Sequence, residues 1–133
     1  MDSEQLGAVA SRYGIRLLLQ FGSSVTGRLH PHSDFDLAVL LQHVPASISV
    51  ELDLAADLQA LAHDREIDLA LINRADPLFL KQILENCRLL YGSERALHEL
   101  NMYAFKRYQD HRRYLAMERE YVARKIQALA PAQ

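Results

Sequence analysis

The order of hydrophobic and polar residues predicts alternating helices and strands over the first part of the chain. Apolar residues at helical spacing follow a cap at Asp2 or Ser3 and stop at Gly14, which predicts a short amphipathic helix. The apolar runs 15–21 and 35–42 have the length and composition of buried strands. A helix, two strands and their connections are therefore expected before residue 45.

The same pattern continues with two more helices and two more strands. One helix is expected behind a cap at Ser49, and another begins at Pro77, whose missing N–H is tolerated in the first turn. Segment 65–73 is typical of a third strand and segment 88–91 of a short fourth one. Together these elements predict an α/β (α+β) fold, a small mixed sheet with helices on one side.

The last third of the chain is expected to form one long helix. Residues 93–129 contain neither Gly nor Pro, and apolar residues recur there at close to 3.6-residue spacing. Neither an internal repeat nor a linker precedes this stretch. A single domain over residues 1–133 is therefore expected, with a core at about 1–92 and a helix at about 93–129.

Charge is divided unevenly along the chain. The 133 residues carry a formal net charge of −2, but residues 1–92 hold 7 basic and 12 acidic residues, and residues 93–133 hold 8 basic and 5 acidic ones. An excess of three positive charges without an aromatic platform motif gives little support for direct nucleic-acid binding. Aromatic and Met side chains accompany the basic residues, as is typical of a protein partner surface, although a solvated face is an alternative. They are Tyr103, Phe105, Tyr114, Met117 and Tyr121.

The expected location is the cytoplasm. Cys87 is the single cysteine, so it cannot form an intramolecular disulfide, and its apolar surroundings suit a small buried side chain. The sequence shows neither a charged and apolar leader nor an apolar run long enough to cross a bilayer. Membrane association is not expected.

Two acids stand where the second apolar run begins. Asp34 and Asp36 are two residues apart, so in a strand they project from the same face, where their repulsion is roughly 3 kcal/mol at an effective dielectric near 20. A divalent cation offsets that repulsion, and ligands that are all carboxylate favour Mg²⁺ or Mn²⁺ over zinc. The alternative is a capped turn and a solvated strand start.

A glycine and a serine end the first apolar run and change the interpretation of the acids. A strand that enters Gly22-Ser23 and then a short helical segment presents backbone N–H groups and a hydroxyl to phosphate oxygens. The Walker P-loop pattern is absent. A phosphate-binding turn followed by a carboxylate pair suits a metal-bound triphosphate, and a third acid on a neighbouring strand is expected. Asp68 fits that demand, with Glu66 as the fallback.

These residues resemble the signature of the polymerase-β-type nucleotidyltransferase superfamily, and more narrowly the minimal nucleotidyltransferases, MntA-like antitoxins encoded beside HEPN-domain toxins. The resemblance covers nearly the whole chain. It implies that Gly22 and Ser23 contact the triphosphate, that Asp34 and Asp36 hold two Mg²⁺ ions, and that Asp68 completes the site and helps to activate the acceptor hydroxyl. Ser33, which precedes the acid pair in the motif, belongs with the nucleotide-binding residues.

One departure from the family pattern concerns the cation that meets the phosphates. Members often carry Arg soon after Gly-Ser, where this chain has Ser24, Val25 and Thr26, followed by Gly27 and Arg28. Arg28 is the expected substitute.

The resemblance also implies a reaction and a partner. Larger relatives bind the acceptor with a second domain, whereas here only about 40 residues follow the core, so the acceptor is expected to come from outside the chain. The implied activity is that of an antitoxin, which transfers AMP from ATP to a tyrosine of a HEPN-family RNase toxin. Two alternatives stay open: an antitoxin that acts by binding alone, and a nucleotidyltransferase with a small-molecule or RNA acceptor.

Overall fold

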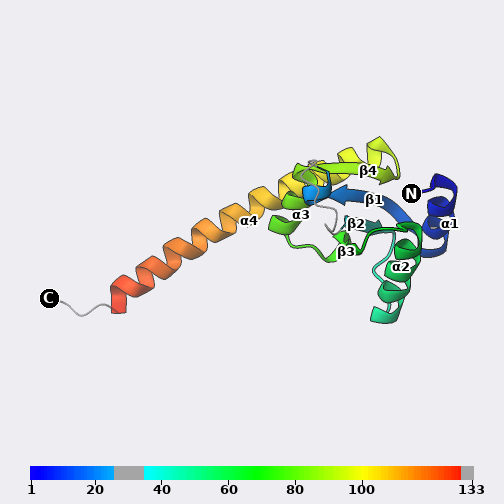
Figure 1. Ribbon diagram of the computed structural model, residues 1–133. Coiled ribbons are helices and arrows are strands. Elements are labelled where there is room, and N and C mark those ends of the chain that lie inside the picture. Colours follow the sequence, from blue (N-terminus) through cyan, green and yellow to red (C-terminus); the bar gives the residue numbers. More distant parts are fainter. Residues whose placement is uncertain (26–34, 130–133) are drawn as a thin grey trace.

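The chain folds around a four-stranded sheet, as the computed structural model shows (Figure 1). The structure describes residues 1–25 and 35–129. In chain order its elements are α1 (Ser3–Tyr13), β1 (Ile15–Phe21), η1 (Gly22–Ser24), β2 (Phe35–Leu41), α2 (Ile48–Leu61), β3 (Ile67–Leu71), η2 (Ile72–Arg74), α3 (Pro77–Glu85), β4 (Cys87–Tyr91) and α4 (Glu94–Leu129).

The sheet is mixed, in the order β3-β2-β1-β4. The inner strand β1 is antiparallel to both of its neighbours, and the other inner strand, β2, is parallel to β3. A parallel pair needs a long crossover, which α2 provides between β2 and β3. The predicted α/β (α+β) class, with its small mixed sheet and long C-terminal helix, is confirmed.

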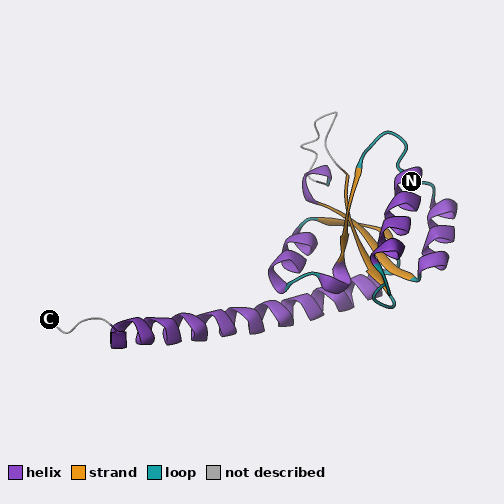
Figure 2. Cartoon of the chain, turned by 90° about the horizontal axis from the view of Figure 1, so that it is seen from below, coloured by secondary structure: helices purple, strands orange, loops and turns teal. Residues whose placement is uncertain are grey.

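Helices cover both faces of the sheet, which corrects the expectation of helices on one side (Figure 2). One core joins α1 and α2 to the sheet face that carries Leu18, Leu37 and Val39. The other joins η2, α3 and the first turns of α4 to the face that carries Leu19 and Ala38. The strand residues 17–19 and 37–39 are all buried, because both faces are covered.

The ends of the helices are set by local capping. The Asp2 carboxylate accepts a hydrogen bond from the Glu4 N–H at 2.9 Å, and Gly14 ends α1 in the left-handed conformation. In the same way, the Asp76 carboxylate accepts from the Phe79 N–H at 2.8 Å at the start of α3. The cap of α2 is Ser47 rather than the predicted Ser49, so this helix begins earlier than expected.

β3 is shorter than the predicted segment 65–73, and the side chain of Asn73 explains where it ends. This amide pairs with both backbone polar groups of Leu41: its Oδ1 accepts from the Leu41 N–H and its Nδ2 donates to the Leu41 carbonyl, each at 2.9 Å. The backbone of Ile72–Arg74 is thereby released to form the 3-10 turn η2.

Only the first turns of α4 belong to the body of the protein, which is the sheet together with the helices packed on it. Leu100 and Ala104 are buried in the second core, so the packing extends past residue 92. Beyond them the helix leaves the body and projects as a long arm (Figure 1). Among the described residues, no helix combines the length and the apolar character that a membrane span requires.

Candidate active site

The predicted phosphate-binding turn lies directly against one of the predicted acids. After extended Phe21, the turn η1 is closed by a hydrogen bond of 3.1 Å from the Val25 N–H to the Gly22 carbonyl. Gly22 has a φ of +78°, and a Cβ built on it would stand 2.7 Å from Oδ2 of Asp36. Position 22 therefore has to be glycine for two reasons: the backbone conformation and the adjacent carboxylate.

Asp36 and Asp68 are neighbours across the parallel pair of strands. They are partners in the register of β2 and β3, so their side chains leave the sheet on the same face from backbones roughly 5 Å apart. A hydrogen bond of 2.8 Å from the Phe35 N–H to the Glu66 carbonyl joins the beginnings of the two strands. The residue opposite Asp36 is thus Asp68, and the fallback Glu66 lies one step before the strand.

The two acids differ in their access to solvent. Asp36 is half-buried between Gly22 and β3, whereas Asp68 is exposed. The half-buried carboxylate is held against the turn, and the exposed one can meet a molecule that arrives from solvent.

The acids face the side of the sheet that α3 and α4 cover. Asp36 has the same strand parity as Ala38, which is buried in the core beneath α3 and α4. Close to the turn, the rings of Phe21 and Phe79 meet edge to face with centroids 6.1 Å apart, which joins the end of β1 to α3. The sequence analysis missed this aromatic pair, because its two residues are far apart in the chain and only tertiary packing brings them together.

Three of the predicted site residues, Arg28, Ser33 and Asp34, lie outside the described residues. Within ranges 1–25 and 35–129, no group of three metal-binding side chains is found. The two carboxylates that are described present only oxygen atoms, which are the ligands preferred by hard cations such as Mg²⁺. Their chemistry therefore fits a magnesium site to which at least one more ligand is added.

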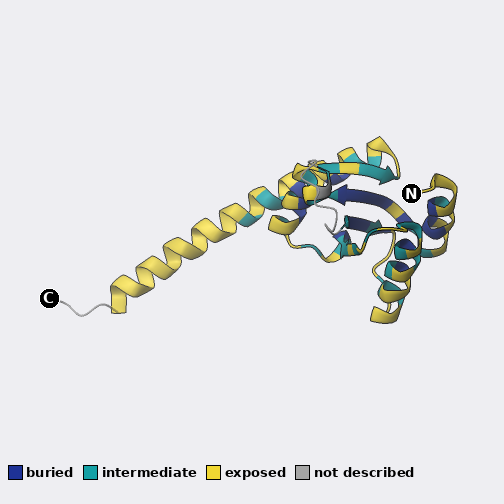
Figure 3. Ribbon diagram, in the orientation of Figure 1, coloured by how far each residue is buried: buried dark blue, intermediate teal, exposed yellow. Residues whose placement is uncertain are grey.

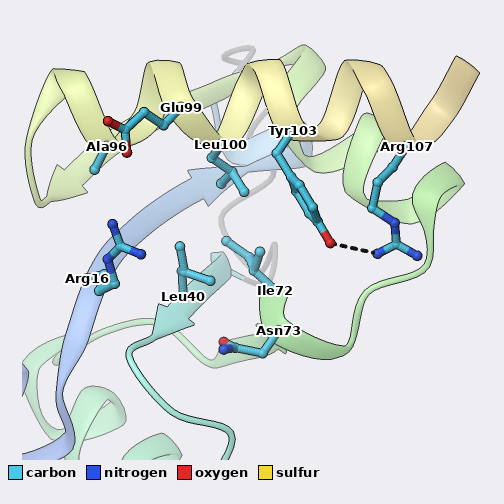
Figure 4. Close-up of a pocket in the computed structure, with 9 residues that line it drawn as sticks. All are labelled: Arg16, Leu40, Ile72, Asn73, Ala96, Glu99, Leu100, Tyr103 and Arg107. Atoms are coloured by element: carbon cyan, nitrogen blue, oxygen red, sulfur yellow. Dashed lines mark hydrogen bonds between the residues drawn. The ribbon is translucent and has the colours of Figure 1, made fainter.

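A separate cavity of about 320 Å³ lies on the same face but at the opposite ends of β1 and β2 (Figure 4). It is bordered by Arg16 at the start of β1 and by Tyr103 and Arg107 from α4, where Arg107 Nη1 donates to the Tyr103 hydroxyl at 3.4 Å. Asp36 lies at the beginning of β2, whereas Leu40, which lines the cavity, lies near the end of the same strand. The cavity is therefore distinct from the acid pair of the described structure, Asp36 and Asp68.

A comparison with known protein families shows to which family the chain belongs. Residues 4–96 match the family described as polymerase beta, nucleotidyltransferase, which is more than half of the sequence and includes both described acids and the Gly-Ser turn. The chain belongs to this nucleotidyltransferase family, which confirms the resemblance seen in the sequence. The comparison with curated proteins finds none that matches.

Solved structures share the fold over nearly the whole chain. A toxin–antitoxin crystal structure with AMP-PNP is 22% identical, with a TM-score of 0.71 over 96% of this chain and 99% of its own. The tri-AMPylated Shewanella oneidensis HEPN toxin in complex with an MNT antitoxin gives 21% identity and a TM-score of 0.64 over 93% and 94% of the two chains. A MntA-HepT toxin–antitoxin structure gives 21% identity and a TM-score of 0.63 over 93% and 95%.

Proposed function

We propose that this protein is an antitoxin that acts as a Mg²⁺-dependent adenylyltransferase, transferring AMP from ATP to a tyrosine hydroxyl of a HEPN-family RNase toxin in the cytoplasm. The observation that carries the proposal is the register pairing of Asp36 with Asp68 beside Gly22, in a chain of the nucleotidyltransferase family. Two carboxylates on one face, one of them directly against a glycine, are suited to a nucleotide with its cations.

The residues of the site divide into two groups. Asp36 and Asp68, together with Asp34, are the proposed ligands of two Mg²⁺ ions. When bound, these ions neutralise the charge of the triphosphate and of the leaving group. Gly22 and Ser23 of the turn, with Ser33 and Arg28, are the proposed contacts of the phosphates.

The proposed reaction is an in-line displacement at the α-phosphorus of ATP. The tyrosine oxygen forms a bond to this phosphorus, the bond to the bridging oxygen of the pyrophosphate breaks, and pyrophosphate leaves. Asp68 is the proposed acceptor of the phenolic proton, and its exposed side chain is accessible to a tyrosine carried by another protein.

The nature of the substrate and of the partner is supported by the shared fold. The similar solved structures are toxin–antitoxin complexes, of which one contains the ATP analogue AMP-PNP and another a tri-AMPylated HEPN toxin. ATP and a HEPN-family protein are therefore the first substrates to test.

The test is AMP transfer to a HEPN-family toxin protein. With ATP and Mg²⁺, the mass of that protein is expected to rise by one or more AMP groups. Asp36→Asn and Asp68→Asn should each lower the initial rate by roughly 10²-fold or more, because each removes a charge from the reacting centre. Binding of the two proteins, measured by calorimetry, should be unchanged.

Asp53→Asn is the matched control. Asp53 is exposed on α2, on the other side of the sheet, and its loss removes the same charge without touching the acid pair. Toxin neutralisation that survives both Asp36→Asn and Asp68→Asn would mean that the protein acts by binding alone. AMP found on RNA or on a small molecule instead of the toxin would exclude the proposed acceptor.

A further inference from the structure

The second half of α4 does not pack on the body of the protein. Every residue in the range 112–129 is exposed, whereas earlier residues of the helix are buried against the sheet and α3 (Figure 3). At 1.5 Å per residue, this arm is about 27 Å long. A helix without tertiary contacts is only marginally stable in water, so the arm is a candidate for a surface that another molecule covers.

The arm carries the same apolar stripe that anchors α4 to the body. Leu115 and Val122 follow the buried Ala104 by about three and five full turns, so they lie on the same face of the helix. Exposure on this face rises from 37% at Leu115 to 82% at Leu129, because the body ends beneath it. A shallow groove follows the stripe and is lined by Leu115, Glu118, Arg119, Val122, Ala123 and Ile126.

The spacing of the stripe is that of a helix that packs along another helix. Leu115, Val122, Ile126 and Leu129 fall within an arc of roughly 60° at 3.6 residues per turn. This narrow stripe, which we call the seam, suits an amphipathic helix that packs along it. The occupant is therefore expected to be helical and apolar on the side that touches the arm.

The charge of the arm indicates which helix fits. Residues 112–129 hold five basic and two acidic residues, a net charge of +3. Arg112 and Arg119 stand on one side of the apolar seam, and Glu118 and Lys125 on the other, so three of the four charged residues that flank it are basic. Two copies of the arm would bring these like charges together, which disfavours self-pairing. A partner helix with acidic residues beside its own apolar seam complements the arm in both respects.

The fold shared with toxin–antitoxin structures extends into the arm. The part of the chain before the arm, residues 1–111, makes up about 83% of the sequence. The match to the AMP-PNP complex covers 96% of the chain and therefore includes part of the arm. Part of the arm is thus common to chains that were solved in such complexes.

We propose that the apolar face of residues 112–129 is the docking surface for an amphipathic helix of the toxin, and that this helix carries acidic residues beside its apolar seam. The identity of the partner rests on the proposed function. The arm then holds the toxin while the acid pair, on the body, modifies it.

The test compares two double variants of the full chain for binding to the HEPN-family toxin protein by calorimetry. Val122→Glu with Ile126→Glu places two charges in the seam and should weaken binding by about tenfold or more. Ala116→Glu with Gln127→Glu adds the same charge away from the seam and should change the affinity by less than about twofold. Arg112→Glu with Arg119→Glu should also weaken binding, and this loss should depend on salt.

Three results would overturn the proposal. The first is equal affinity of the seam variant and the control variant. The second is a dimer of the isolated chain, seen by light scattering, that the seam variant dissolves, since the occupant would then be a second copy. The third is binding of a single-stranded RNA oligonucleotide through the same face. If Arg112→Glu with Arg119→Glu has no effect, the acidic character of the partner helix is wrong.

The result for docking is separable from the result for catalysis. A wild-type chain that binds the HEPN-family protein through the seam without transferring AMP sustains the docking surface and ends the proposed enzyme function. A chain that transfers AMP equally well with and without the seam substitutions does the reverse. Circular dichroism and thermal unfolding of each variant verify that the body is folded.

Discussion

At the scale of single residues, the candidate site depends on the lack of a side chain at position 22. Gly22 takes a backbone conformation that L-residues rarely adopt, and Oδ2 of Asp36 lies only 2.7 Å from where a Cβ would stand. The same residue thus allows the turn to form and sets the position of a proposed metal ligand. Stability and activity are coupled at this one position.

Gly22→Ala is expected to damage activity more than folding. The positive φ costs about 1–2 kcal/mol of unfolding free energy, and the new methyl group displaces the Asp36 carboxylate from its place beside position 22. AMP transfer should fall by about tenfold or more, since a catalytic group displaced by about 1 Å can cost that much and beyond. Urea unfolding and initial rates measure the two effects.

Gly7→Ala is the control for that substitution. Gly7 lies inside α1, and nothing stands within 4 Å of a Cβ at this position. The change should stabilise the protein by about 0.5–1 kcal/mol and leave the rate of AMP transfer unchanged. An active Gly22→Ala variant would show that Asp36 is not needed where the structure places it.

At the scale of elements, a polar cluster ties α1 to α2 on the face away from the acids. The Tyr13 hydroxyl donates to the Asp57 carboxylate at 2.6 Å, and Arg12 pairs with the same carboxylate at 2.9 Å. The hydrogen bond from Tyr13, followed by the contact with Arg12, lowers the pKa of Asp57. The carboxylate in turn raises the pKa of the Tyr13 hydroxyl.

The direction of these shifts sets the pH dependence of the tie. Because the pKa of Asp57 is lowered in the folded state, its stabilising contribution is present above the unfolded pKa of about 3.9 and is lost as the pH falls through the folded value. Tyr13→Phe should therefore destabilise the protein at pH 7, and the difference from wild type should shrink on acidification. Urea unfolding at several pH values checks this.

Tyr91→Phe serves as the comparison, because within the described residues its hydroxyl has no hydrogen-bond partner. Its effect on stability should not vary over the same acidic range. A Tyr13→Phe variant whose deficit stays constant down to the lowest pH would show that the Asp57 carboxylate is not part of the tie.

At the scale of the whole molecule, the body and the arm of α4 have different roles. The body holds both cores, the acid pair and the first turns of α4. The arm contributes exposed surface alone. Stability should therefore reside in the body, while partner binding is shared with the arm.

A chain that ends at residue 111 should be as stable as the full chain. Its unfolding free energy is expected to agree within about 0.5 kcal/mol, since none of the described residues that it lacks, 112–129, is buried. Leu100→Ala, which acts on the buried part of the same helix, should by contrast cost about 2–5 kcal/mol. Chemical denaturation compares the three proteins, and a clear loss of stability in the shortened chain would mean that the arm packs on the body.

The sequence by itself determined most of the elements and the candidate chemistry. Asp2, Gly14 and Pro77 mark helix ends through local hydrogen bonds and backbone restrictions, which depend on few neighbours. The Gly-Ser turn and the two nearby acids, Asp34 and Asp36, were recognised because their spacing reflects chemistry within one short segment. The long helix was likewise predictable from the absence of Gly and Pro.

Only the tertiary structure decided how these elements meet. Apolar periodicity shows that a strand is buried, but it does not tell which helix covers which face, and so the helices proved to lie on both sides of the sheet. The pairing of Asp36 with Asp68 depends on the register of two strands separated by α2, which no local pattern encodes. The free face of the arm likewise became visible only where the body ends, because a buried and an exposed apolar stripe have the same sequence.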